Sequence, residues 1–325
     1  TDADSDGEEL PETAVISILA VVGPTGSGKT ALAIDLAVRL DTEIISADSM
    51  QVYRGMEIGT AAPTLEQLAT VRHHFVGMLE PDQEFSAGEF RRLAREVVEG
   101  LNARGRVAVV VGGSGLYISA LIDGLFEGPP KDDEIRSKLH AEAESGVELF
   151  ERLKGVDPEY AASILPGDLR RIVRALEVHE LTGRPISALH HEHQERTGEY
   201  SAVQVALDYP REELYRRINE RVDAMVAAGF ADEVKSLLDR GYRAEIERLR
   251  SVGYREIAAY IDGAKSLDEA VEATKQQTRR FAKRQLTWFR ADGRIHWMPV
   301  AGGAYTPDHV ERGLELLQAE EGVAR

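Results

Sequence analysis

Short runs of apolar and β-branched residues, each closed by turn residues, recur along the chain and are typical of buried strands. The run at residues 107–111 is uninterrupted and is closed by two glycines. Such a run is expected where helices cover both faces of a parallel sheet. Strands are predicted at residues 16–22, 43–47, 107–111, 203–207 and 294–298. They indicate an α/β fold with about five parallel strands joined by crossover helices.

Apolar residues at helical spacing fill much of the chain between these runs. A helix is predicted at residues 29–40, directly after the first strand, and another at 86–104. The second begins with a capping signal formed by Ser86 and Glu89. The pattern is helical again from residue 211 to residue 285, and its ends or turns are marked by Gly229, Gly241 and Gly263.

The segment from residue 128 to residue 200 differs from its surroundings because its pattern is helical only. Helices are predicted in it at residues 132–143, 147–156, 157–164 and 168–182. We therefore predict an α/β core with C-terminal helices, built from residues 14–127 and 201–325, and an all-helical insertion domain at 128–200. Residues 1–13 are acidic and lack the apolar stretch of a secretory signal, so we predict a disordered acidic tail.

Composition and charge fit a globular enzyme. No apolar run approaches the roughly 20 residues of a membrane span, and the absence of cysteine excludes disulfides and thiolate metal sites. Both observations favour a cytoplasmic protein without a membrane partner. The net charge of −17 argues against a nucleic-acid partner unless positive residues gather locally. They do so in a basic patch, which contains Arg279, Arg280, Lys283, Arg284, Arg290 and Arg294.

The residues between the first predicted strand and the helix after it match the phosphate-binding loop motif. They are Gly23, Pro24, Thr25, Gly26, Ser27, Gly28, Lys29 and Thr30. In such a loop, backbone N–H groups and the helix N-terminus bind an anion. Lys29 supplies positive charge to the phosphates, and the Thr30 hydroxyl is placed to bind Mg²⁺. The motif occurs in ATP-binding proteins, including kinases, so it predicts a phosphate ligand without deciding which one.

Asp48, at the end of the second predicted strand, is the candidate catalytic carboxylate. Open α/β sheets place their sites at the carboxyl ends of strands. A carboxylate there can bind a metal, act as a general base or cap the next segment, and we favour the base although spacing alone does not decide. The strand at 107–111 ends in glycines and Ser114, where a nucleotide hydrolase would carry a metal-binding acid.

Several blocks in the same order resemble the tRNA dimethylallyltransferases, also called tRNA isopentenyltransferases. The resemblance covers nearly everything from Val15 to about Pro299. Its blocks are the phosphate loop, ISADSMQVY from Ile45, GMEIGTA from Gly55, VGGSGLY from Val111, RRIVRALEV from Arg170, VGYR from Val252 and KRQLTWFR from Lys283. The resemblance implies a P-loop NTPase-like parallel sheet with a helical insertion.

In that family the loop holds the diphosphate of dimethylallyl diphosphate with Mg²⁺ rather than a nucleotide. The resemblance therefore implies transfer of a dimethylallyl group to N6 of the adenine immediately 3′ of a tRNA anticodon. Lys29 and Mg²⁺ would stabilise the leaving diphosphate, and Asp48 would accept a proton from the N6 amine. Ser114 stands where the family usually has Thr, whose hydroxyl contacts the bridging oxygen and the reacting amine.

The resemblance also implies contacts with the anticodon stem-loop of tRNA. They are Asp48, Ser49, Met50, Gln51, Ser114, Arg136, Asp168, Leu169, Arg170, Arg171, Ile172, Arg250, Ser251, Val252, Gly253, Tyr254, Arg255, Lys283, Arg284, Gln285, Leu286, Thr287, Trp288, Phe289 and Arg290. The insertion and the C-terminal helices would grip the anticodon arm while the target adenine is flipped from its loop. We expect a monomer.

Three alternatives stay open from the sequence. They are an adenylate isopentenyltransferase that prenylates free nucleotides, an ATP-dependent kinase, and an RNA-binding protein whose loop has lost its function. The basic C-terminal region disfavours the first, and intact Lys29, Thr30 and Asp48 disfavour the last. His73 and His74 are predicted to be polar surface residues rather than metal ligands, because no cysteine or acidic cluster accompanies them.

Overall fold

The structure is a computed structural model that describes residues 16–125, 128–194 and 200–323. The predicted tail at 1–13 lies outside the described residues, as do residues 14–15, 126–127, 195–199 and 324–325 of the predicted core and insertion. The chain divides into two compact units. The larger unit contains the residues up to 122 and those from 199 onward, and the smaller unit contains residues 123–198.

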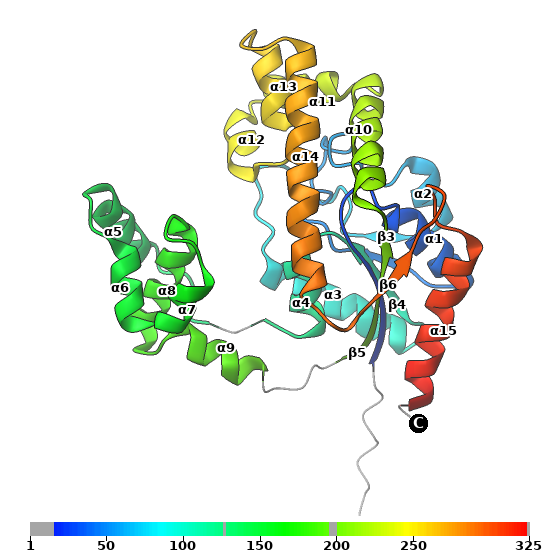
Figure 1. The fold of residues 1–325 in the computed structure, drawn as a ribbon, viewed down its shortest axis with the longest axis horizontal. Coiled ribbons are helices and arrows are strands. Elements are labelled where there is room, and N and C mark those ends of the chain that lie inside the picture. Colours follow the sequence, from blue (N-terminus) through cyan, green and yellow to red (C-terminus); the bar gives the residue numbers. More distant parts are fainter. Residues whose placement is uncertain (1–15, 126–127, 195–199, 324–325) are drawn as a thin grey trace, which may run out of the picture. The chain divides into compact units, whose positions relative to one another are not determined.

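The larger unit contains a six-stranded parallel sheet with the strand order β3-β2-β4-β1-β5-β6 (Figure 1). The strands are β1 (Ile16–Val22), β2 (Ile44–Ser46), β3 (His73–His74), β4 (Ala108–Gly112), β5 (Tyr200–Asp208) and β6 (Ile295–Pro299). The apolar runs predict five of these strands. Strand β3 has only two residues, both half-buried, so it has no apolar run to detect. The prediction that His73 and His74 are surface residues is therefore corrected: they form the edge of the sheet.

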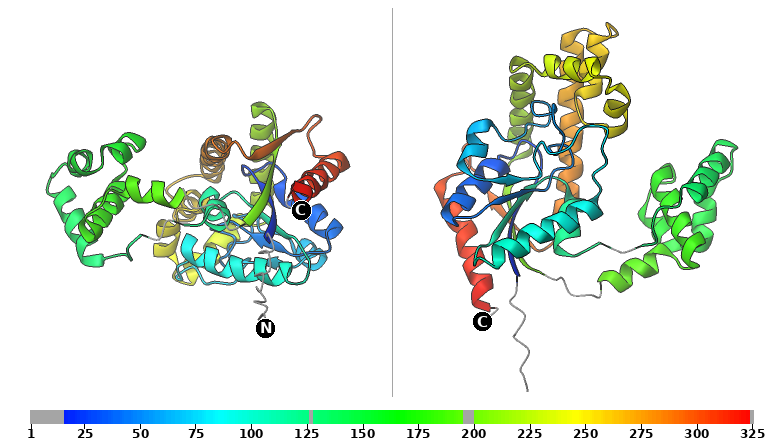
Figure 2. Two further views of the ribbon diagram at one scale, coloured as in Figure 1. Left: turned by 90° about the horizontal axis from the view of Figure 1, so that it is seen from below. Right: turned by 180° about the vertical axis from the view of Figure 1, so that it is seen from behind.

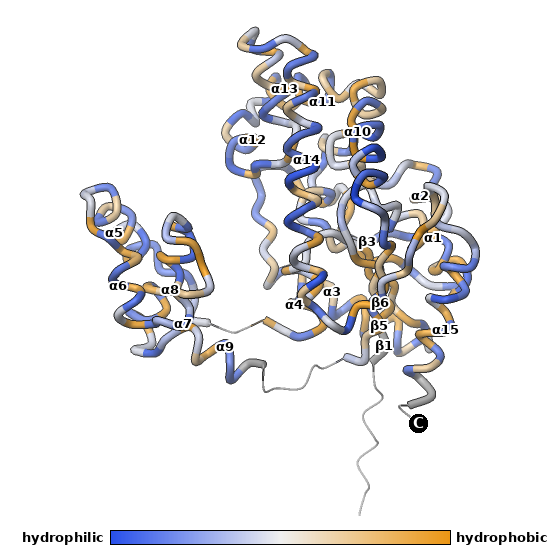
Figure 3. Tube along the Cα trace, viewed as in Figure 1, coloured by the Kyte–Doolittle hydropathy of each residue, from blue (hydrophilic) through white to orange (hydrophobic). Residues whose placement is uncertain are grey.

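Helices cover both faces of this sheet, which explains why its central strands are apolar throughout (Figure 2). One face packs against α1 (Lys29–Arg39) and α15 (Pro307–Val323), and the other against α3 (Ala87–Asn102) and α4 (Gly115–Ile122). In β1, Leu19 and Val21 face the first layer while Ile18 and Val22 face the second. Figure 3 shows the hydrophobic residues gathered along the strands. The carboxyl ends of the parallel strands therefore meet at one edge, where a site is expected.

Beyond this edge stands a group of helices whose own core is shared with the chain that follows β2 (Figure 1). The helices are α10 (Arg211–Ala227), α11 (Phe230–Asp239), α12 (Arg243–Leu249), α13 (Tyr254–Ile261) and α14 (Leu267–Arg290); a short α2 (Leu65–Thr70) precedes β3. Tyr254 is fully buried, and its hydroxyl lies 2.7 Å from Glu233 Oε1 and 2.9 Å from Met56 O. These contacts fix the loop after β2 against the helices.

The described part of the smaller unit is helical. Its helices are α5 (Asp133–Glu144), α6 (Leu149–Val156), α7 (Pro158–Ser163), α8 (Leu169–Thr182) and α9 (Ile186–Gln194). Among its apolar core lies one fully buried acid, Glu177. Glu177 accepts hydrogen bonds from Arg136 (2.8 and 2.9 Å), Arg174 (2.7 Å) and Asp132 N (2.8 Å). Burial opposes ionisation, but these donors outweigh it and lower the pKa of Glu177 to about 2.

The Glu177 cluster leads to a prediction about stability. Glu177→Gln should lower the free energy of unfolding at neutral pH by about 3 kcal/mol, because two arginines lose their buried partner. The pKa of Glu177 is lowered in the folded state, so its contribution is complete above the unfolded value of 4.5 and is lost as pH falls toward about 2. Denaturant unfolding of the full chain should show that the difference in free energy of unfolding between the wild-type protein and Glu177→Gln becomes smaller below pH 4.5. Glu144→Gln, on the exposed end of α5, is the matched control; an equal effect of both changes would contradict this account.

Candidate active site

The phosphate loop lies between β1 and α1, as the motif predicts. Gly26 has a φ of 82°, and a Cβ there would lie 2.9 Å from the Ile218 side chain, so glycine is required at this turn. Gly28 precedes α1 with a φ of 85°, and no side chain caps the helix. The backbone N–H groups of Lys29 and Thr30, at the start of α1, are therefore available to an anion, whereas Ala31 N bonds to Gly28 O (3.2 Å).

Two cationic side chains converge on this loop, Lys29 and Arg221 of α10. Lys29 is half-buried, and its Nζ lies 3.3 Å from Pro24 O. Desolvation and the neighbouring Arg221 lower the pKa of Lys29 to about 8, although Asp48 opposes the shift. Desolvation also lowers the pKa of Arg221, whose Nε is buried without a hydrogen-bond partner. An anion bound here would relieve both the repulsion and the unsatisfied N–H.

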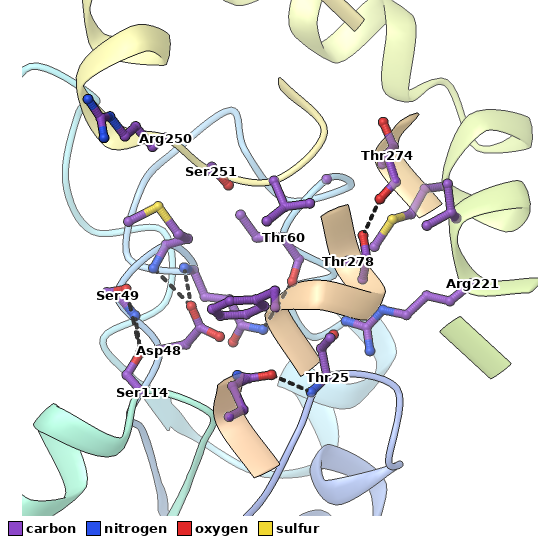
Figure 4. Close-up of a pocket in the computed structure, with 18 of the residues that line it drawn as sticks. Thr25, Asp48, Ser49, Thr60, Ser114, Arg221, Arg250, Ser251, Thr274 and Thr278 are labelled. Carbon is purple, nitrogen blue, oxygen red and sulfur yellow. Dashed lines mark hydrogen bonds between the residues drawn. The ribbon is translucent and has the colours of Figure 1, made fainter. Parts of the chain in front are cut away.

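Asp48 follows β2 and shapes the turn after it. Its Oδ1 accepts hydrogen bonds from Met50 N (2.9 Å) and Gln51 N (3.4 Å) (Figure 4). This oxygen therefore caps the turn, which is one of the three roles that the sequence allows for Asp48. These bonds hold the carboxylate in one orientation and leave Oδ2 for another partner. Ser114 Oγ accepts a hydrogen bond from Ser49 N (3.1 Å), which ties the end of β4 to the same turn.

A cavity of about 250 Å³ joins the phosphate loop to Asp48. Its polar wall includes Thr25, Lys29, Thr30, Asp48, Ser114 and Arg221, and its apolar wall includes Met50, Val222, Met225, Phe230, Leu249, Val252 and Phe281. Figure 4 shows Asp48 and Ser114 on one side, Arg221 on the opposite side and Thr25 between them. An anion site, a carboxylate and an apolar wall in one cavity suit the transfer of an apolar group from a phosphorylated donor.

Comparisons with known proteins agree with this geometry. The model of the IPP transferase family matches residues 51–292. The tRNA dimethylallyltransferase 2 of Geotalea uraniireducens is 47% identical over 295 residues, which cover 90% of this chain and 94% of that protein. The tRNA dimethylallyltransferase of Geobacter metallireducens is 48% identical over 287 residues, which cover 88% and 93%. The chain belongs to the tRNA dimethylallyltransferase family.

Solved structures with the same fold support this membership. A tRNA isopentenylpyrophosphate transferase from Bacillus halodurans is 39% identical, with a TM-score of 0.69 over 95% of this chain and 99% of that one. A eukaryotic dimethylallyltransferase acting on tRNA is 27% identical, with a TM-score of 0.76 over 87% and 73%. The predicted fold class, family and enzyme class, a prenyltransferase, are confirmed. Among the described residues, no helix is long and apolar enough to cross a membrane.

The larger unit carries most of the tRNA contacts expected of a dimethylallyltransferase. Ten of them line the cavity: Asp48, Ser49, Met50, Gln51, Ser114, Arg250, Ser251, Val252, Arg284 and Gln285. Four others are exposed along α14, namely Lys283, Thr287, Trp288 and Arg290, and Arg284 is exposed there as well. Part of the basic patch is already paired, since Arg290 lies 2.9 Å from Asp208 and Arg294 lies 2.7 Å from Asp292. The exposed positive face of α14 therefore centres on Arg280, Lys283 and Arg284.

Three residues of the predicted contacts have side chains that lie in hydrophobic cores, and as tRNA contacts they stay predictions. Tyr254 is 0% exposed, Phe289 2% and Ile172 2%. Each of these side chains packs in a hydrophobic core below the surface residues that neighbour it in sequence. Leu286 is also half-buried and packs against the core that α1 shares with the sheet, and Gly253 precedes α13 as its N-cap with a φ of 93°. Arg255, by contrast, is exposed and lies 3.9 Å from Glu247.

The helical unit holds the remaining predicted contacts. Asp168 caps α8 by accepting a hydrogen bond from Arg171 N (3.3 Å). Leu169, Arg170 and Arg171 are exposed at the start of that helix. Arg136 is engaged by the buried Glu177, and one third of its side chain remains exposed. These residues stay predictions as tRNA contacts.

Arg221 is a cation that lines the cavity and that the sequence does not identify as a site residue. It lies one helical turn after Arg217, whose Nε donates to Gly26 O (2.9 Å) behind the phosphate loop. A usable signal was present, because the helix that carries both arginines begins directly after β5 and therefore starts at the carboxyl edge of the sheet. Neither arginine belongs to a recognised motif, so the sequence does not distinguish them from the other arginines of this helix.

Proposed function

We propose that this protein transfers a dimethylallyl group from dimethylallyl diphosphate to N6 of the adenine 3′ of the tRNA anticodon. The observation that carries the proposal is that Lys29, Arg221 and Asp48 line one cavity with an apolar wall. In the reaction, a bond forms between N6 and C1 of the dimethylallyl group while the bond from C1 to the diphosphate oxygen breaks. The proton of N6 passes to Asp48, and the electron pair of the broken bond leaves with the diphosphate.

Each group has a task set by its charge. Lys29, Arg221 and the loop amides stabilise the charge that develops on the leaving diphosphate. Asp48, held through Oδ1, uses its second oxygen as general base for an amine that conjugation with the purine makes a poor nucleophile. The Ser114 hydroxyl, beside Ser49, is assigned to the reacting amine and the bridging oxygen. The apolar wall receives the five-carbon group and excludes water.

We also propose that Mg²⁺ accompanies the donor. The donor set fits a metal bound jointly by protein and diphosphate, because the Thr30 hydroxyl lines the cavity and no group of three or more metal-ligating side chains is found among the described residues. Thr30 would hold the ion together with oxygens of the diphosphate. The ion would add positive charge opposite the leaving group.

An ATP-dependent kinase is disfavoured by the end of β4. Nucleotide hydrolases carry a metal-binding acid at such a strand end. A Cβ at Gly112 would lie 2.1 Å from Ala47 O, so a carboxylate cannot be accommodated at this position without moving the chain directly after β2. The exposed basic face of α14 argues in the same way against a free nucleotide as acceptor, because a mononucleotide is too small to use it.

The test is a transfer assay with the full chain, Mg²⁺ and labelled dimethylallyl diphosphate. The acceptors are an anticodon stem-loop with adenine 3′ of the anticodon, the same RNA with guanine at that position, and AMP. We expect label in the first RNA only. Label in AMP but not in RNA would replace this proposal by the adenylate alternative, and phosphate transfer from ATP would replace it by the kinase. Monomeric state and cytoplasmic location stay predictions.

A further inference from the structure

Gln285 lies on α14 between the phosphate loop and the end of β4. Its side chain is 7% exposed, although Lys283 and Arg284 beside it are exposed. Gln285 Oε1 accepts a hydrogen bond from Thr25 N (2.9 Å), and Nε2 donates to Gly113 O (3.0 Å). One amide group thus joins the loop that binds the donor to the strand end that carries Ser114.

The connection continues toward the catalytic carboxylate. Ser114 follows Gly113 and binds Ser49 N through its Oγ (3.1 Å), directly beside Asp48. The approach at Gly113 is close, since a Cβ there would lie 2.2 Å from Gln285 Nε2. Glycine at this position is what leaves room for the amide. A hydrogen-bonded path therefore runs from the phosphate loop through Gln285 to the turn that holds the base.

We propose that Gln285 is a positioning residue that fixes the spacing between the diphosphate of the donor and the carboxylate that deprotonates the acceptor. The inference rests on the proposed function. Thr25 N–H is already bonded to Gln285, so it is not among the amides left to bind diphosphate. Losing the bond should therefore change the alignment of the two substrates more than their affinities. A misplacement of about 1 Å between reacting groups can cost about a hundredfold in rate.

The first test replaces Gln285 by Met, which keeps the length of the side chain and removes both hydrogen bonds. Gln285→Met should lower the single-turnover rate about tenfold to a hundredfold. Both polar atoms of the Gln285 amide are bonded within the protein, so the tRNA contact predicted for this residue should add little affinity through its side chain. The dissociation constants for the stem-loop RNA and for dimethylallyl diphosphate should therefore change less than about threefold. Gln276→Met, on the exposed face of the same helix, is the matched control and should react like the wild-type protein.

The second test distinguishes positioning from a general loss of structure. In Gln285→Glu, the ionised carboxylate still accepts from Thr25 N–H but cannot donate to Gly113 O. Burial at this position and the facing oxygen of Gly113 both disfavour the carboxylate, so the pKa of this carboxyl should be raised from its usual value of about 4.3. Protonation restores the donor, so the single-turnover rate relative to wild type should rise as pH falls from about 8 to about 6. A Gln285→Met rate within about twofold of wild type would overturn the inference. It would also be overturned if Gln285→Met lost rate and affinity equally and the rate of Gln285→Glu relative to wild type did not change with pH. If the wild-type protein itself transferred nothing to RNA, the proposed function would fail first.

Discussion

Asp48→Asn should reduce the single-turnover rate of dimethylallyl transfer by about 10²- to 10⁴-fold while leaving RNA binding largely intact. The amide oxygen can still accept the hydrogen bonds from Met50 N and Gln51 N, so the turn after β2 is kept. The amide cannot accept the N6 proton at neutral pH, so the chemical step loses its base. The measurement compares rapid-quench transfer with the dissociation constant of the stem-loop RNA.

The control for this change is Asp82→Asn, which removes the same charge at an exposed position of the same unit. It should leave both rate and binding close to wild type. An unchanged single-turnover rate in Asp48→Asn would remove the base assignment. A large loss of RNA affinity without a loss of rate at saturating RNA would instead reduce Asp48 to a shaping element of the turn.

Arg221→Gln should lower the transfer rate by about 10²- to 10³-fold, the usual effect of removing one donor to a developing negative charge. The argument rests on a desolvated guanidinium whose buried Nε has no hydrogen-bond partner, next to Lys29 and the phosphate loop. Affinity for inorganic diphosphate, measured by calorimetry, should also fall. The change should have little effect on RNA binding.

Arg216→Gln provides the matched control for Arg221. Arg216 lies on the same helix, but it is exposed and pairs with Glu213 (2.6 Å) and Glu220 (2.5 Å). Its replacement should leave transfer unchanged. Equal behaviour of the two variants would contradict the assignment of Arg221 to the diphosphate.

The fold was largely predictable because the same apolar patterns that identify the strands also bury them. Residues 107–111 are a clear example, since β4 is buried along its whole length between helices. Strand β3 was not predictable, because His73 and His74 pair with β2 without contributing to a core. The helical ends near Gly229, Gly241 and Gly263 were predicted correctly, since each of these glycines adopts the positive φ that ends or begins a helix.

The candidate site was predictable only where a motif names its residues. One cavity is lined by the phosphate loop, by Asp48 and by Ser114, as the matching sequence blocks imply. Tyr254 and Phe289 lie in matching blocks, but the structure shows them buried. A motif does not distinguish an exposed position from one that supports the surface from the core. Arg221 and the double role of Gln285 depend on contacts across about 170 to 260 residues of chain, which no local pattern records.

The central claim is that the phosphate loop holds a prenyl diphosphate while Asp48 deprotonates an extruded adenine. It is tested most directly by a crystal structure with an unreactive thio analogue of dimethylallyl diphosphate and an anticodon stem-loop. The account predicts the diphosphate against Lys29, Thr30 and Arg221, with the adenine N6 about 3 Å from Asp48 Oδ2. A purine nucleotide in the phosphate loop, or an adenine that lies away from Asp48, would contradict it.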